Sequence, residues 1–116
     1  MSRSAAVVKA LTTAELEGVP DTECRERLSR VLVEPTFVSL AWEYGSLDAT
    51  RLCCVVARLE DGDRALVYCE DGFGPQEPWG AVILSEASMG SDDQWYGSLY
   101  DAAASFGLCD STPEPG

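Results

Sequence analysis

The residues of this chain that could do chemistry are mainly carboxylates and cysteines. Its 116 residues include 20 Asp and Glu, five Cys and no His. The absence of histidine excludes Ser-His-Asp and Cys-His catalysis, histidine-ligated metals and the usual proton shuttle near neutral pH. Paired carboxylates could act as acid and base, but so many acidic residues bring some pair together in any fold. We therefore predict that the protein is not an enzyme, and we name no catalytic residue and no cofactor.

One group of acidic residues flanks a predicted hairpin and could in principle hold a hard cation. Its members are Glu60, Asp61, Asp63, Glu70 and Asp71. Calcium takes about six to eight oxygen ligands, and the glycine and distal glutamate of an EF-hand loop are missing here. Asp-Gly turns form without any ion. We therefore interpret the group as a solvated turn and predict no metal site.

The five cysteines show no Cys-x-x-Cys spacing that would suit redox or zinc chemistry. Neighbouring Cys53 and Cys54 should point to opposite faces of a strand. Acidic neighbours disfavour a thiolate at Cys69. We interpret all the cysteines as small buried residues of a protein kept in a reducing cytoplasm. They are Cys24, Cys53, Cys54, Cys69 and Cys109.

The loop at residues 70–80 is the strongest candidate for a functional segment. Its glycines lack the GxGxxG spacing and its acidic residues would repel phosphate, so it should not bind a nucleotide. Phe73 and Trp79 allow two interpretations. Either both rings anchor an irregular loop to the core, or at least one ring is exposed as an interface hot spot with an acidic border.

The last predicted helix offers a related signal, because Tyr96 and Tyr100 lie one turn apart. The two side chains either pack at the edge of the core with their hydroxyls in water, or extend a contact surface together with Asp101. The complete set of predicted partner contacts is Glu70, Asp71, Phe73, Glu77, Trp79, Tyr96, Tyr100 and Asp101.

The charge of the chain is unevenly distributed along the sequence. Residues 1–58 hold seven basic and eight acidic residues, whereas residues 59–116 hold only Arg64 against 12 acidic residues. The formal net charge is -12. This division predicts one strongly negative face. It also argues against direct nucleic-acid binding, which needs clustered Lys and Arg.

Several local patterns predict the elements that would position these residues. Thr12 and Glu15 have the spacing of a capping box that begins a short helix ending at Gly18. A second helix should run from residue 20 or 21 to residue 32, with Cys24, Leu28, Val31 and Leu32 on its apolar face and Pro35 ending it. Strands are expected at 36–44, 52–59, 64–70 and 80–84, with an Asp-Gly hairpin turn between the second and third. A final helix is expected at 92–106, capped by Ser91 and Gln94 and ended by a left-handed Gly107 on which Leu108 folds back. Its core face should consist of Trp95, Leu99, Ala102, Ala103 and Phe106.

These elements predict an α+β domain over residues 1–109, followed by a disordered tail at 110–116. Two N-terminal helices precede a four-stranded antiparallel meander, and the C-terminal helix packs on one sheet face. The other face should meet solvent or a partner. No apolar run of about 18 residues and no signal peptide is evident, so we expect a cytoplasmic protein that does not contact membranes.

The leading hypothesis is a small protein-binding module, of an inhibitor or immunity type, whose acidic face engages a basic protein partner. Proteins that themselves bind nucleic acid belong to this class of partner. Toxin-neutralising immunity proteins and phage inhibitors of defence enzymes are comparable in charge and size, although no motif supports a named family. Arginine supplies seven of the eight basic residues, which favours a GC-rich bacterial source. The comparison with phage inhibitors adds a phage as an alternative source. One alternative is a homo-oligomeric structural or accessory domain, with a homodimer as its simplest form. A carboxylate metal binder or small enzyme is the third.

Overall fold

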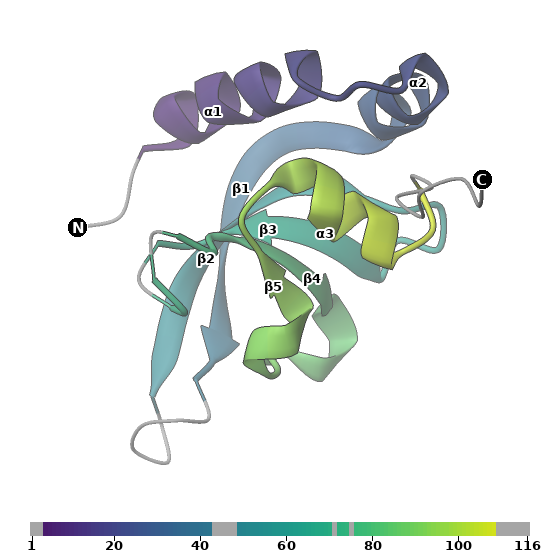
Figure 1. Ribbon diagram of the computed structural model, residues 1–116. Helices are drawn as coiled ribbons and strands as arrows, with labels where there is room; N and C mark the ends of the chain where they lie inside the picture. Colours follow the sequence, from purple (N-terminus) through teal and green to yellow (C-terminus); the bar gives the residue numbers. More distant parts are fainter. Residues whose placement is uncertain (1–3, 43–48, 71, 75, 109–116) are drawn as a thin grey trace.

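The computed structural model describes residues 4–42, 49–70, 72–74 and 76–108 (Figure 1). Two helices come first, α1 (Ala5–Glu17) and α2 (Thr22–Val31), and a third helix, α3 (Leu99–Ser105), comes last. Between them lie β1 (Leu32–Ala41), β2 (Thr50–Arg58), β3 (Arg64–Tyr68), β4 (Trp79–Ile83) and β5 (Trp95–Tyr96). Two short 3-10 helices, η1 (Leu84–Glu86) and η2 (Asp92–Gln94), separate β4 from β5.

The strands form one antiparallel sheet in the order β1-β2-β3-β4-β5, so every strand pairs with its neighbour in sequence. The predicted α+β class and the meander are therefore confirmed. The sheet has five strands where four were predicted, because Trp95 and Tyr96 pair with Gly80 and Trp79. The predicted strand end at Tyr44 and the predicted tail at 110–116 lie outside the described residues.

Helix α1 begins earlier than the sequence patterns predict. Ser4 is its N-cap, and the Ser4 side chain accepts a hydrogen bond from the backbone N–H of Val7 at 3.3 Å. Thr12 lies buried in the middle of the helix, where its hydroxyl donates to the carbonyl oxygen of Val8 at 2.8 Å. The predicted capping box at Thr12 is wrong, since a Thr hydroxyl can bond backward along a helix as readily as it can cap one. The predicted stop at Gly18 is confirmed.

Helix α2 agrees with its prediction in its extent and in its buried face, which Cys24 and Leu28 form, and Asp21 is its N-cap. Its C-terminal residue is followed directly by β1, so Pro35 lies within a strand rather than ending a helix. The pairing register of β1 against β2 shifts between Leu32 and Thr36. This irregularity surrounds Pro35, which has no N–H to donate to a ladder, and β1 bends over the sheet beside α1 (Figure 1).

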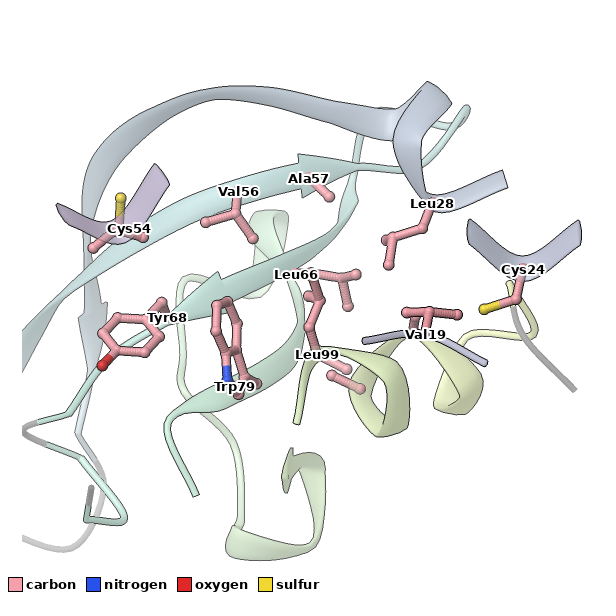
Figure 2. Packing of buried hydrophobic residues seen from close by; sticks show 14 residues of the cluster. Val19, Cys24, Leu28, Cys54, Val56, Ala57, Leu66, Tyr68, Trp79 and Leu99 are labelled. Carbon is pink, nitrogen blue, oxygen red and sulfur yellow. The ribbon is translucent and has the colours of Figure 1, made fainter. Parts of the chain in front are cut away.

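All three helices pack on one face of the sheet, which we call the helix face (Figure 2). Its core combines residues of every layer: Val8, Val19, Cys24, Leu28, Cys54, Val56, Ala57, Leu66, Tyr68, Trp79, Ala81, Leu99, Ala102 and Ala103. The register of β2 against β3 shifts between Val55 and Ala57. As a result, the consecutive residues Val56 and Ala57 both belong to this core.

The opposite face, which we call the loop face, has a core of its own. The segment from η1 to β5 folds over it and contributes the buried side chains of Met89 and Trp95. They pack with Leu40, Cys53, Val55, Ala65, Val67, Cys69 and Val82. The prediction that this face meets solvent or a partner is therefore wrong, because an irregular segment without helical or strand periodicity covers it.

The final predicted helix is divided into three parts. Residues 92–94 form only η2, Trp95 and Tyr96 form β5, and α3 begins after Ser98. The Ser98 side chain caps α3 by accepting from the N–H of Asp101 at 3.1 Å. The Ser91–Gln94 pairing exists in part, because Gln94 Oε1 accepts from the N–H of Ser91 at 3.0 Å. The sequence pattern was correct for the core positions of residues 99–106 but wrong for where the helix begins.

The end of α3 matches its prediction. Gly107 has a φ of 81°, the left-handed conformation that glycine adopts without strain. The N–H of Leu108 then donates to the carbonyl oxygen of Ala103 at 3.1 Å, and the Leu108 side chain packs back on the helix-face core.

The outer edge of β1 is partly occupied by the segment that follows η1. The N–H of Ala41 donates to Ala87 at 2.8 Å, and the N–H of Met89 donates to the carbonyl oxygen of Ala41 at 3.1 Å. These bonds form a parallel bridge between Ala41 and Ser88. Across the described part of the chain, none of the helices has the length and hydropathy needed to cross a bilayer.

Candidate protein-binding site

The acidic turn between β2 and β3 is built from carboxylates that protein donors already satisfy. Asp61 Oδ1 accepts from the N–H groups of Asp63 and Arg64, each at 3.0 Å, and Asp61 Oδ2 accepts from Arg64 Nε at 2.9 Å. The backbone N–H groups of Arg64 and Asp63, helped by the Arg64 guanidinium, lower the pKa of Asp61 to about 2. Asp63 accepts from the N–H and the hydroxyl of Ser85.

Glu70 lies beyond the opposite end of β3 from this turn, so the acidic residues considered as metal ligands do not converge. Asp71 lies outside the described residues. Within the described ranges, no group of three or more Cys, Asp or Glu residues is arranged to hold a metal ion.

The described cysteines divide into two kinds. Cys53, Cys54 and Cys69 are buried free thiols, and burial raises the pKa of the Cys54 thiol above its ordinary value. Cys53 and Cys54 belong to the loop-face and helix-face cores respectively, which confirms that they point to opposite sides of β2. Cys24 is disulfide-bonded, so the prediction that every cysteine is a reduced core residue is wrong for Cys24.

Phe73 and Trp79, the two aromatic residues of the 70–80 loop, lie on opposite faces of the sheet. Trp79 is 3% exposed in the helix-face core, with its ring centroid 4.8 Å from that of Tyr68. Phe73 is half-buried on the loop face, where its centroid lies 5.0 Å from Trp42 and 5.8 Å from Trp95. Both rings therefore anchor the loop, and Trp79 offers almost no surface to a partner.

A row of side chains crosses the helix face and includes two of the predicted contact residues, Trp79 and Tyr96. Pairing between successive strands aligns Phe37, Cys54, Tyr68, Trp79 and Tyr96. The middle of the row is buried, whereas Phe37 at one edge is 39% exposed and Tyr96 at the other is half-buried. The row thus ends in an accessible aromatic residue at each edge of the sheet.

The predicted contact residues beside Tyr96 lie where the β3–β4 loop meets the start of α3. The carbonyl oxygen of Gln76 would lie 3.2 Å from a Cβ placed on Gly97, so these two segments are in contact. We define the acidic rim as Glu70, Glu77, Tyr96, Tyr100 and Asp101. Glu77 and Asp101 are exposed, whereas Glu70, Tyr96 and Tyr100 are half-buried. The hydroxyl of Tyr68 donates to Glu70 and connects the rim to the core.

One rim neighbour was not predicted from the sequence. Glu15 of α1 accepts a hydrogen bond from the backbone N–H of Leu99 at 2.8 Å, and so adds a carboxylate at the start of α3. The two residues are 84 positions apart, and no local spacing relates them. The spacing of Glu15 from Thr12 instead predicts a capping box within its own helix.

The acidic residues described in the second half of the chain are not gathered on a single surface, so the predicted single negative face is wrong. The β2–β3 turn carries Glu60, Asp61 and Asp63, and η1 with Glu86 is bonded to that turn through Ser85. The acidic rim lies toward the opposite end of β3. Residues 65–116 contain no Lys or Arg, so the chain segments that build most of the rim bring no positive charge to it.

No family model, curated protein sequence or solved structure matches this chain.

Proposed function

We propose that the protein is a binding module whose acidic rim engages a basic protein partner. The single observation that carries this proposal is that the rim combines exposed carboxylates with half-buried tyrosines and lies among chain segments without Lys or Arg. Tyrosine is enriched at the centres of interfaces, because its ring supplies contact area and its hydroxyl supplies a hydrogen bond. Carboxylates around such a centre select positively charged partners and repel acidic ones.

The whole-protein charge supports the same partner class. A net charge of -12 repels nucleic acid and acidic proteins and accelerates association with a basic surface. If the partner is itself a nucleic-acid-binding protein, the carboxylates of the rim would take the place of phosphates. An inhibitor that covers the basic site of such a partner is the activity that we favour.

A cytoplasmic location is part of the proposal. The buried free thiols of Cys53, Cys54 and Cys69 are compatible with a reducing compartment. The disulfide-bonded Cys24 weighs against it, because disulfides are rare in reducing cytosol.

Charge reversal in the rim tests the proposal. The protein would be immobilised and exposed to an extract of its source organism, and the retained proteins would be identified by mass spectrometry. We expect basic proteins that are retained at about 50 mM salt and released by about 500 mM, because the Debye length shrinks over that range. The affinity of each purified partner would then be measured by calorimetry for variants of the module.

The rim variant is Glu77→Lys with Asp101→Lys, and the matched control is Glu26→Lys with Glu86→Lys. All four residues are exposed, so their replacement should not disturb the core. Each variant exchanges two carboxylates for two lysines, so the change in net charge is the same. We expect the rim variant to bind at least about tenfold more weakly, a loss of about 1.4 kcal/mol, and the control to change affinity much less. Equal weakening by both variants would refute a specific rim, and retention of a second copy of this chain would favour the homodimer alternative.

A further inference from the structure

A cavity of about 360 Å³ lies at the opposite end of α3 from the acidic rim. It is formed where the last turn of α2, the β2–β3 turn and the residues after α3 come together (Figure 1). Its lining residues are Arg27, Arg30, Val31, Leu59, Glu60, Arg64, Phe106 and Leu108. A volume of this size is near the lower end of the range found for small-ligand sites, roughly 300–1,000 Å³.

The charge of this lining is opposite to that of the molecule. Eight Lys and Arg residues occur in the whole chain, and three of them line this one cavity, whereas Glu60 is the single carboxylate among the lining residues. Arg27 forms an ion pair with Glu23. Arg64 donates through Nε to Asp61 at 2.9 Å, which leaves its two terminal nitrogens for other acceptors. Arg30 has no ion pair within the described part of the chain.

The remainder of the lining is apolar and includes an aromatic ring. Val31, Leu59 and Leu108 line the cavity, together with the half-buried ring of Phe106. The Arg64 guanidinium carbon lies 5.6 Å from the centroid of the Phe106 ring, a cation–π contact that restrains the Arg64 side chain. The cavity therefore offers forked hydrogen-bond donors beside a surface suited to a hydrophobic group.

We propose that this cavity binds a small molecule that carries an oxyanion, either a phosphate or a carboxylate, on an apolar body about the size of an aromatic ring. A planar guanidinium donates two parallel hydrogen bonds to either oxyanion, and Arg30 and Arg64 are the anchors. The apolar body packs against Phe106 and Leu59. This site is independent of the acidic rim, because it takes a ligand of opposite charge at the other end of α3.

The test is a titration of the full chain followed by two-dimensional amide NMR, with four probes. Phenyl phosphate and benzoate carry both features of the ligand, inorganic phosphate carries only the oxyanion, and phenol carries only the ring. We expect saturable shifts at Leu59, Phe106 and Leu108 with phenyl phosphate, benzoate or both, and binding at least about tenfold weaker for inorganic phosphate and phenol. The stronger of the two complete probes identifies the oxyanion.

Arginine variants distinguish binding in this cavity from non-specific electrostatic attraction of the anion to the protein. Arg30→Gln and Arg64→Gln are expected to weaken binding at least about tenfold. Arg58→Gln makes the same charge change on the same hairpin but lies outside the lining, and is expected to leave binding unchanged. Arg30 is exposed and has no ion pair among the described residues, so its replacement keeps the fold. No saturable shift with any probe, or equal weakening by all three variants, would overturn the proposal.

Discussion

The two faces of the sheet are covered in different ways. On the helix face, three regular helices supply mainly aliphatic and alanine side chains at helical spacing, and the core is spread over many residues of the helices and strands. On the loop face, the cover is the irregular segment between β4 and β5, and a few large side chains, above all Trp95 and Met89, fill the space. The residues at the centre of both faces are buried. A sheet face can therefore be buried without a regular helix above it.

The segments that cover the two faces differ in how their backbone groups are hydrogen-bonded. A helix satisfies its own backbone hydrogen bonds, whereas an irregular segment needs partners elsewhere. Trp95 Nε1 donates to the carbonyl oxygen of Met89 at 2.8 Å, and Asp63 accepts from the N–H and hydroxyl of Ser85. The loop-face cover is thus fixed by a small number of specific contacts, and single substitutions there should have large effects.

The largest expected effect is that of Trp95→Ala. Trp95 is fully buried, and its replacement removes both the indole packing and the bond to Met89. We expect the free energy of unfolding to fall by about 3–5 kcal/mol, at least as much as for Leu99→Ala on the helix face. Chemical denaturation measures both changes.

Leu52→Ala serves as the control for Trp95→Ala, since Leu52 is 46% exposed, and should cost less than about 1 kcal/mol. A loss of under about 1 kcal/mol for Trp95→Ala would mean that the loop face is not a true core.

Gly80→Ala should have the next largest effect. A Cβ on Gly80 would lie 2.7 Å from Cε2 of Trp95, and the indole is held by its surroundings. We expect a loss of about 1–3 kcal/mol from overpacking. The cost should largely disappear when the same substitution is made in Trp95→Ala protein, and a double-mutant cycle measures this coupling.

Gly18→Ala is a matched glycine control for this cycle. Gly18 has a helical φ of -82°, and an added Cβ would meet no atom closer than 3.5 Å. Its replacement should be neutral or slightly stabilising. A Gly80→Ala cost that persists without Trp95 would show that the backbone, and not the indole, requires glycine.

The smallest effect concerns Asp61, whose turn positions Asp63 against the loop-face cover. Because the pKa of Asp61 is lowered to about 2, its contribution to stability is present above the unfolded pKa of about 4 and is lost as the pH falls toward 2. An NMR titration of the Asp61 carboxyl carbon should give a midpoint near 2. In Asp61→Asn protein, this part of the pH dependence between about 4 and 2 should be absent. A midpoint near 4 would contradict the hydrogen bonds assigned to the turn.

The parts of the fold that the sequence predicted are those set by local chemistry. Cys24 and Leu28 form the buried face of α2, the Asp-Gly turn joins β2 to β3, and Gly107 ends the last helix, each as its residue type or spacing requires. The fifth strand was missed because Trp95 and Leu99 are four residues apart, which is also the spacing of a helix face. Only the pairing of Trp95 with Gly80, 15 positions away, distinguishes a strand from a helix here.

The candidate site was predictable in its composition but not in its geometry. Glu77 and Asp101 are exposed, as acidic residues usually are, and could be named from the sequence. Trp79 could not be placed, because the same residue type serves as a core anchor and as an interface centre. Glu15 reaches the rim through a contact between α1 and the start of α3, and the arginine cavity likewise depends on how α2 meets the β2–β3 turn.

The bridge between Ala41 and Ser88 has a consequence for how molecules of this protein meet one another. An open edge strand is a template on which further chains can polymerise into fibres. Here Pro35 offers no donor, and the outward groups of Ala41 are already paired. Backbone groups point outward at alternate residues of an edge strand. Between Pro35 and Ala41, only Phe37 and Ser39 are therefore left to pair with an incoming strand. Because so few backbone groups are available for pairing, this edge is a poor template for repeated strand addition, even though the aromatic ring of Phe37 is exposed beside it.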